Sequence, residues 1–321
     1  MTAFVRFAWT VLGYNLFVVA WGAFVRATGS GAGCGKHWPT CNGEIVPRSP
    51  GAATAVEFTH RVTSGIAFLL VLVLVVWAFR AFPRAHPTRK ASVASIVFMI
   101  SEALVGAGLV LFGWVAKDPS AARGWVMAIH LTNTFLLLAA LALAADWGRH
   151  PGGFETRGRR GAAGLLLGAL VAVVVAGITG AIAALGDTLF PATSFAEGLR
   201  QELSAQASLL LRLRILHPFA AVTAGVVLLA AARAALRARP DGRVRRAAVA
   251  VAGLVAIELA VGVANVLLLA PIPLQLVHLL LADLLWLALV LLASASLAPG
   301  AVSAPASGSE RPGLRAPGFS G

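Results

Sequence analysis

Four histidines stand within long apolar stretches of the sequence, where an ionisable side chain is costly and marks a candidate functional site. They are His60, His130, His217 and His278. We expect each in the first turns of a membrane-spanning helix, with all four at similar depth. The imidazole nitrogen is a good ligand for iron, and two facing imidazoles fill the axial positions of a haem. The pattern predicts two haem sites, one between His60 and His130 and one between His217 and His278.

Other roles for these four histidines are less well supported. One isolated membrane histidine would more often be a satisfied core residue, but four at one depth favour a shared function. A zinc site favours mixed cysteine, histidine and carboxylate ligands at tight spacing, and no cysteine lies near them in the apolar stretches. A proton relay uses membrane histidine and glutamate without requiring four histidines at one depth. The other three histidines, His37, His86 and His150, fall in expected loops, where a solvated side chain is the default.

Glu57 lies three residues before His60, so both fall on one helix face. A glutamate near a helix start is favourable to the helix dipole, and this ordinary interpretation stays open. Beside a haem ligand it is a candidate acid, base or cation-stabilising group. Arg61 points about 100° away from His60, either to snorkel or to meet a haem propionate. The second half has Leu213 or Arg214 near the equivalent place, which suggests that one half does chemistry and the other holds a fixed cofactor.

The only two cysteines, Cys34 and Cys41, lie in a loop expected on the oxidising side of the membrane, where disulfides persist. A structural staple and a redox-active pair close to the His60 site both remain open. A metal site made of Cys34, His37 and Cys41 would lack a clear fourth ligand.

The elements that must position these residues are membrane-spanning helices. Apolar residues make up 59% of the chain and charged residues 12%, about half the charged share of a soluble domain. The net charge of +13 could suggest nucleic-acid binding. The arginines cluster in short loops between apolar runs, however, so we expect no nucleic-acid partner. Eight runs have about the length needed to cross a bilayer. They cover approximately 8–26, 56–79, 93–116, 124–145, 161–186, 214–236, 247–270 and 275–297.

Basic loops alternate with loops poor in lysine and arginine. The basic loops are 80–92, 146–160 and 233–246, and the poor ones are 27–55, 117–123 and 271–274. This alternation predicts a multi-pass protein with both termini in the cytoplasm and the histidines near the extracytoplasmic face. The loop 187–213 fits this pattern least well, because it mixes arginines with acidic residues.

An internal repeat divides the chain. Glu102-Ala-Leu-Val-Gly106 resembles Glu258-Leu-Ala-Val-Gly262, Thr28-Gly29 resembles Thr179-Gly180, and the histidines recur at about 150 residues. The repeat predicts an all-α integral membrane protein of two pseudo-repeated four-helix bundles, which are well suited to hold a flat cofactor. We expect the bundles over 1–150 and 151–297. The remainder, 298–321, is rich in Pro, Gly, Ser and Ala and is predicted to be disordered.

These motifs together resemble the haem A synthase family, in the bacterial form with a cysteine pair in the first outer loop. The motifs are Thr28-Gly29-Ser30-Gly31, Cys34 to Cys41 followed by Asn42-Gly43, Glu57-Phe58-Thr59-His60-Arg61, His130-Leu131, Leu216-His217-Pro218 and Gln275-Leu276-Val277-His278-Leu279-Leu280-Leu281-Ala282-Asp283. The resemblance covers residues 1 to about 297, with the histidine, glutamate and cysteine positions in matching order.

The resemblance implies an oxidoreductase of the cell membrane that converts haem O to haem A for cytochrome oxidase. One porphyrin methyl becomes a formyl group by way of a hydroxymethyl group, with the oxygen drawn from water or from dioxygen. His217 and His278 would bind a haem b cofactor, and His60 and His130 would bind the substrate haem O. Glu57 would be catalytic.

The resemblance also implies a disulfide between Cys34 and Cys41. Haem O synthase would be a partner, the electron acceptor is unidentified, and a homo-oligomer is left open.

Two other classes remain as alternatives. A quinol-linked membrane cytochrome with two haems b would use the same histidine pairs but would need neither Glu57 nor the cysteine loop. A transporter built from repeats favours helices broken near the midplane and inverted repeats. Here the prolines lie mainly in loops or at helix ends, apart from Pro218 beside His217.

Overall fold

The computed structural model describes residues 2–150 and 152–299. The elements described in these ranges are all helices, with no strand among them, and eight stretches are long and apolar enough to cross a membrane. The eight stretches are α1 (Ala3–Ala27), α2 (Ala52–Ala81), α3 (Pro87–Leu111), α4 (Ala121–Trp147), α5 (Arg160–Leu189), α8 (Leu216–Ala238, preceded by the short α7, Leu209–Arg214), α9 (Gly242–Leu267) and α10 (Ile272–Ser296). The prediction of an all-helical membrane protein with eight spans is confirmed.

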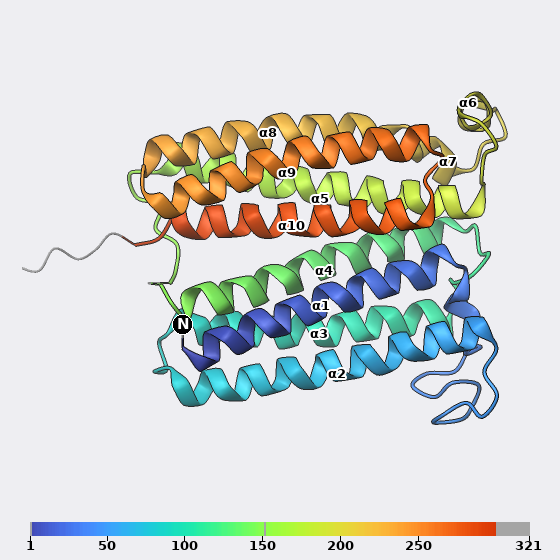
Figure 1. The fold of residues 1–321 in the computed structure, drawn as a ribbon, viewed down its shortest axis with the longest axis horizontal. Coiled ribbons are helices and arrows are strands. Elements are labelled where there is room, and N and C mark those ends of the chain that lie inside the picture. Colours follow the sequence, from blue (N-terminus) through green and yellow to red (C-terminus); the bar gives the residue numbers. More distant parts are fainter. Residues whose placement is uncertain (1, 151, 300–321) are drawn as a thin grey trace, which may run out of the picture.

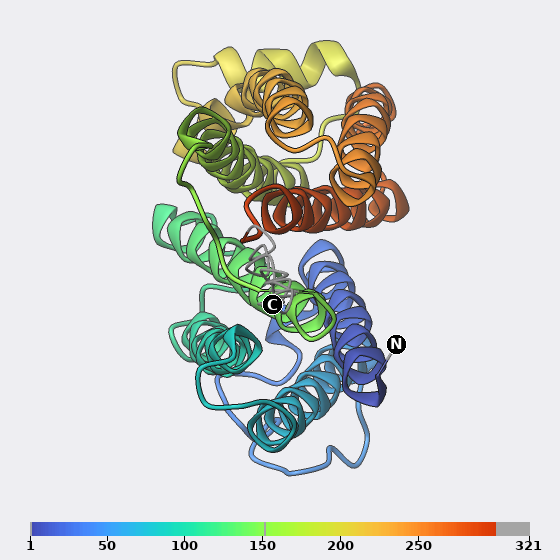
Figure 2. The ribbon, with the colours of Figure 1, turned by 90° about the vertical axis from the view of Figure 1, so that its left-hand side faces the viewer.

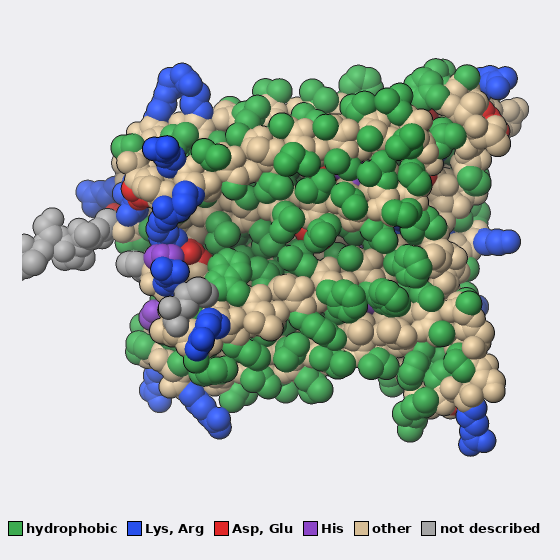
Figure 3. All heavy atoms as spheres, in the orientation of Figure 1, with side chains coloured by type: hydrophobic (Ala, Val, Ile, Leu, Met, Phe, Trp, Pro, Cys, Tyr) green, Lys and Arg blue, Asp and Glu red, His purple; other side chains and the backbone are tan. Residues whose placement is uncertain are grey.

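The long helices form two groups that lie side by side (Figure 1). Helices α1 to α4 pack against one another as the N-terminal bundle, and α5, α8, α9 and α10 pack as the C-terminal bundle. Seen from the end, α10 lies against the N-terminal bundle, where it contacts α4 and α1 (Figure 2). Lysine and arginine side chains gather at the end that holds the N-terminus, called here the termini end (Figure 3). The loop of the two cysteines and the short helix α6 (Phe195–Leu203) lie at the opposite, loop end.

The middle of the contact between the bundles is apolar and aromatic. The rings of Phe135 in α4 and Trp286 in α10 stack with their centroids 4.9 Å apart. The Trp286 indole N–H donates to the Phe135 carbonyl at 2.7 Å, so the buried indole keeps a polar partner. Leu138 and Leu141 of α4 and Leu289 of α10 are fully buried. This packing fixes the two bundles against each other along their length.

A polar cluster around Asp146 joins the bundles at the termini end. Its carboxylate accepts from the Arg243 guanidinium at 2.8 Å and from the Ser294 hydroxyl at 2.7 Å. The Trp147 indole N–H also donates to Ser294, at 3.0 Å. The His150 ring lies 3.0 Å from Asp146, so it is a partner in this cluster and not the solvated loop residue that the sequence suggested.

The start of the predicted disordered tail is held by the same end of the molecule. Ala298 is buried, and its carbonyl accepts from Arg159 at 2.9 Å and from Arg239 at 2.8 Å. The rest of that prediction, over 300–321, lies outside the described residues.

Two helices end earlier than hydropathy alone predicts. Helix α3 ends at Leu111 although the apolar run continues to 116. The following Gly113 takes a φ of 75°, and the Trp114 N–H donates to the Leu109 carbonyl at 2.8 Å. This is the Schellman arrangement, which satisfies the last carbonyls and turns the chain out of the helix. Helix α9 ends at Leu267, again short of the predicted 270.

The loop with mixed charge contains two short helices, α6 and α7, which follow Ser194 and Ser208 as capping residues. Arg214 at its end pairs with Asp187 at 2.8 Å and with Glu202. The basic charge of this segment is therefore partly neutralised within the loop. This explains why the number of arginines alone did not indicate on which side of the membrane the loop lies.

The Asp146 cluster predicts a specific loss of stability. Asp146→Ala leaves Arg243 without its buried carboxylate, and removing one partner of such a pair costs roughly 3 kcal/mol. The thermal unfolding temperature of the detergent-purified protein should fall by several degrees. Glu44→Ala is the control, because Glu44 faces Arg48 on an exposed surface where a salt bridge contributes little. Equal unfolding temperatures for the two variants would contradict this account of the interface.

Candidate functional site

The four membrane histidines lie in four different helices, two in each bundle. His60 is in α2 and His130 in α4, while His217 is in α8 and His278 in α10. With a rise of 1.5 Å per residue, His60 lies about 12 Å along α2 from its first residue, and His278 about 9 Å along α10. All four side chains are half-buried. The helices thus bring the histidines to comparable positions in the loop-end half of each bundle.

The C-terminal pair has the spacing that a metal between two imidazoles would require. The ring centroids of His217 and His278 are 6.2 Å apart, and the ring planes meet at 72°. Metal–imidazole bonds are about 2 Å long, so two rings on opposite sides of one iron have centroids roughly 6 Å apart. These two residues therefore fit an axial ligand pair for a haem. In the N-terminal bundle, His60 of α2 and His130 of α4 stand at the corresponding places near the loop end.

Glycines on neighbouring helices make room for three of the imidazoles. A Cβ added to Gly180 would lie 2.9 Å from the ring of His217, so any side chain there would displace the ring. The glycine–histidine pairs are Gly22 with His60, Gly180 with His217 and Gly262 with His278. These contacts make Gly22 the counterpart of Gly180, whereas the sequence comparison of the two halves had matched Gly180 with Gly29.

Two glutamates that the sequence analysis used only to recognise the repeat lie against the histidines. The Nδ1 atom of His130 is 3.1 Å from Oε1 of Glu102 in α3. The Nδ1 atom of His278 is 3.2 Å from Oε1 of Glu258 in α9. The shared motif Glu-x-x-x-Gly was the signal that could have identified both residues. It gave no indication that each glutamate meets a histidine of the next helix.

Glu57 is buried at the start of α2, where it is bound to the loop of the two cysteines. One carboxylate oxygen accepts from the Cys34 backbone N–H at 2.8 Å, and the other accepts from the Arg61 guanidinium. Arg61 also donates to the carbonyls of His37 at 2.7 Å and Thr40 at 2.6 Å. Arg61 therefore does not snorkel, as one sequence interpretation had it. Instead, the Glu57–Arg61 pair holds the loop onto α2, within one turn of the histidine of that helix.

Cys34 and Cys41 form a disulfide. Both are buried, and the Thr54 hydroxyl of α2 donates to the Gly33 carbonyl at 2.8 Å beside them. The disulfide uses both sulfurs, so the metal site considered with His37 is wrong. Within residues 2–150 and 152–299, no group of three or more histidine, cysteine or carboxylate side chains is placed to hold a metal ion.

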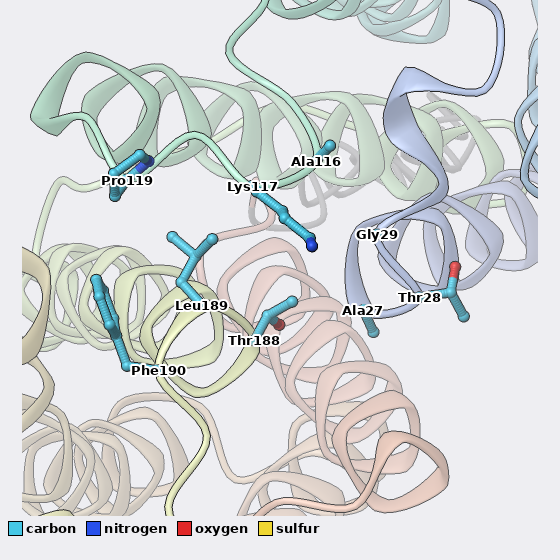
Figure 4. A pocket seen from close by; sticks show the side chains of 9 residues that line it. All are labelled: Ala27, Thr28, Gly29, Ala116, Lys117, Pro119, Thr188, Leu189 and Phe190. Atoms are coloured by element: carbon cyan, nitrogen blue, oxygen red, sulfur yellow. The ribbon is translucent and has the colours of Figure 1, made fainter.

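A cavity of about 520 Å³ opens between the two bundles at the loop end (Figure 4). It is lined by Ala27, Thr28, Gly29, Ala116, Lys117, Pro119, Thr188, Leu189 and Phe190. Beside it, Arg26 of α1 crosses to the C-terminal bundle. Its guanidinium donates to the Ala184 carbonyl at 2.7 Å, to the Thr188 hydroxyl at 2.7 Å and to the Gln275 amide oxygen at 2.8 Å. The lining includes none of the four histidines, so this cavity is separate from the two histidine pairs.

Comparison with known proteins places the chain in a family. The COX15-CtaA family, described as cytochrome oxidase assembly protein, matches residues 5–290. A protein of Thermus thermophilus named Protoheme IX farnesyltransferase is 50% identical over 282 residues, which are 88% of this chain and 46% of that protein. A protein of Geobacillus kaustophilus named Heme A synthase is 39% identical over 128 residues, or 40% of this chain and 38% of that protein. A protein of the same name from Alkalihalophilus pseudofirmus is 36% identical over 128 residues, or 40% of each chain. Two curated relatives match this chain over most of the chain's length. The chain spans only about half of the length of those two relatives.

The loop makes a prediction about thiol chemistry. Because Cys34 and Cys41 are joined, a thiol reagent should label neither of them in oxidised, denatured protein, and should label both after reduction. Mass spectrometry of the labelled peptides counts the modified cysteines. Two labelled cysteines without reductant, in protein purified under air, would contradict the disulfide.

Proposed function

Because the chain belongs to the COX15-CtaA family of cytochrome oxidase assembly proteins, we propose that it acts in haem A biosynthesis as a haem A synthase. Its reaction is the oxidation of one porphyrin methyl of haem O to a formyl group, by way of a hydroxymethyl group. Water supplies the oxygen atom, and an electron acceptor outside the chain takes the electrons that are removed, with the protons released to solvent. The single observation that supports this most is the spacing of 6.2 Å between the His217 and His278 rings, which suits a resident haem in a chain with a second histidine pair. Relatives named Heme A synthase, 36–39% identical over 128 residues, support the same assignment.

In this proposal His217 and His278 hold haem b, and His60 and His130 bind the substrate haem O. When bound, haem b supplies reversible electron transfer at its iron. The protein orients both groups through imidazoles on packed helices and surrounds them with apolar side chains. Low polarity around the sites strengthens the effect of the few charged side chains nearby.

Glu57 is the residue that stabilises the reacting carbon. Oxidation of a methyl attached to a porphyrin builds positive charge at that carbon. A preorganised carboxylate nearby stabilises this developing charge. The Cys34 N–H and the Arg61 guanidinium hold the carboxylate in one orientation, one turn from His60. The carboxylate therefore needs little reorganisation when charge develops.

A haem O synthase is the partner that supplies the substrate. The relative named for a farnesyltransferase matches this chain over only 46% of its own length. More than half of that relative lies outside the match, so the activity in its name need not belong to the part that resembles this chain. The basic termini end is assigned to the cytoplasm, so the histidine pairs lie toward the extracytoplasmic face of the cell membrane.

The test is to express the chain together with a haem O synthase in a host that makes neither haem O nor haem A, and to separate the extracted haems by chromatography. Haem A in the extract, absent when the chain is omitted, supports the function. Haem O alone, from membranes that contain folded protein, overturns it. Haem O formed without the added synthase would instead assign farnesyl transfer to this chain. Retained haem b with quinol oxidation and no altered haem would assign a membrane cytochrome.

The haem b site makes a spectroscopic prediction. In His278→Ala, the C-terminal pair loses one axial ligand, so the low-spin haem b spectrum of the purified protein should disappear or become high-spin. His37→Ala is the control, because only its backbone carbonyl contacts Arg61 and its ring lies in the loop. An unchanged low-spin spectrum in His278→Ala would rule out this ligand assignment.

The role of Glu57 makes a kinetic prediction. Glu57→Gln keeps an oxygen that accepts from Cys34 but removes the charge, so haem A formation should fall by about 100-fold or more. The haem b spectrum should stay normal, because His217 and His278 are in the other bundle. Glu44→Gln removes a carboxylate from the same loop at an exposed position and should leave the yield unchanged. A wild-type yield in Glu57→Gln would reduce Glu57 to a residue that only anchors the loop.

A further inference from the structure

The four histidines differ in what supports the ring nitrogen Nδ1. This atom faces Glu102 at 3.1 Å in His130, Glu258 at 3.2 Å in His278 and the Thr179 hydroxyl at 3.3 Å in His217. In His60 the same atom is buried and has no ion-pair partner within the described chain. The Nδ1 atoms of His60, His130 and His278 all lack an aligned hydrogen bond, so the difference is the glutamate contact that His130 and His278 have and His60 lacks. The C-terminal pair is therefore supported on both rings, and the N-terminal pair on one ring only.

We propose that Glu102 and Glu258 are positioning residues for His130 and His278, and that the unsupported His60 is the displaceable ligand through which the N-terminal site exchanges its haem. This inference rests on the proposed function, because it assumes that both histidine pairs bind haem. It adds that three of the four histidines are held in place by a polar side chain, and that His60 is the ligand that can leave.

A carboxylate beside the second nitrogen of a ligating imidazole has a defined effect. It fixes the tautomer and the ring orientation and raises the basicity of the ligating nitrogen. A carboxylate within a membrane-spanning helix is costly, so its presence calls for a specific partner. Glu102 and Glu258 occur at equivalent places in the two halves, and each meets the histidine of the following long helix.

Glu102 is itself held in place by α4. Its carboxylate accepts from the Thr134 hydroxyl and from the Asn133 amide, both within one turn of His130. The glutamate and its histidine therefore form one rigid unit between α3 and α4. A ring anchored in this way keeps its position when the partner ligand leaves.

His60 is placed against backbone and not against a polar group. Its ring packs over Gly22, where an added Cβ would lie 3.0 Å away. The charged residues nearest along its own helix, Glu57 and Arg61, are committed to each other and to the disulfide loop. Rotation of the His60 ring away from an iron would break no hydrogen bond or ion pair at Nδ1.

This asymmetry matches the different needs of the two sites. A substrate site must take up haem O and release the product, whereas a cofactor site must keep its haem through many turnovers. A bis-histidine site with one weakly held ligand can open at that side and retain the haem by the other. The supported pair His217 and His278 has no such weak side.

The experiment measures haem loss from each site separately. The chain, co-expressed with a haem O synthase and purified with its haems, is mixed with excess apomyoglobin as a haem acceptor. The transferred pigment is separated into haem b and haem O with its oxidation products. Visible and electron paramagnetic resonance spectra report the ligation state of the haem that remains.

Glu102→Gln should accelerate loss of haem O and its products by about 10- to 100-fold and leave haem b loss unchanged. Glu258→Gln should show the reverse. His60→Ala should give a high-spin N-terminal haem that is lost within about threefold of the wild-type rate, whereas loss in His130→Ala should rise by at least about tenfold. Thr132→Val is the matched control, because the Thr132 hydroxyl bonds only to the Ala128 carbonyl of its own helix.

Equal rates of haem loss in His60→Ala and His130→Ala would overturn the displaceable-ligand assignment. Unchanged rates and spectra in Glu102→Gln and Glu258→Gln would overturn the positioning role, and these two variants keep the proposal testable if a histidine variant does not fold. Haem A formation is measured in the same membranes. A chain that binds both haems as described but forms no haem A would fail the proposed function and still support this inference.

Discussion

An imidazole or carboxylate within a membrane-spanning helix is costly unless it finds polar partners inside the protein, because hydrocarbon offers none. Much of the structure follows from this constraint. It explains why Glu102 and Glu258 each lie about 3 Å from a histidine of the next long helix. Small residues meet a related need at the backbone, since Gly22 and Gly180 let an imidazole approach the neighbouring helix closely. Each bundle therefore packs its helices around two of the four membrane histidines.

The contact between the bundles satisfies the same constraint in a different way. Its middle is closed by Phe135 and Trp286, whose indole N–H is bonded to a carbonyl and not left unpaired. Its charged groups lie at the two ends, with Asp146 at the termini end and Arg26 at the loop end. Polar links at both ends and apolar packing between them hold the two bundles at a constant distance.

The disulfide loop is bound to the turn of α2 that precedes His60. Glu57 and Arg61 of α2 bind the backbone of the loop at three residues. Both cysteines of the loop are buried. In sequence the glutamate, the arginine and the cysteine pair are separate features with separate interpretations. In the fold they make one unit, next to the turn that carries His60. Any change in the loop therefore reaches the candidate substrate site through two charged side chains.

The sequence by itself determined the eight spans, the helical class and the four histidines. Burial in hydrocarbon is a constraint on each segment alone, and a run of about 20 apolar residues records it directly. Helix ends were less certain, as at Leu111, because a Schellman turn depends on local backbone conformation and not on hydropathy.

Only the tertiary structure decided which groups meet: Glu102 with His130, Gly22 with His60, and Arg61 with the loop carbonyls. Each of these contacts joins segments separated by more than 20 residues, and their meeting depends on how helices rotate and pack. Hydropathy along one segment carries no record of that rotation.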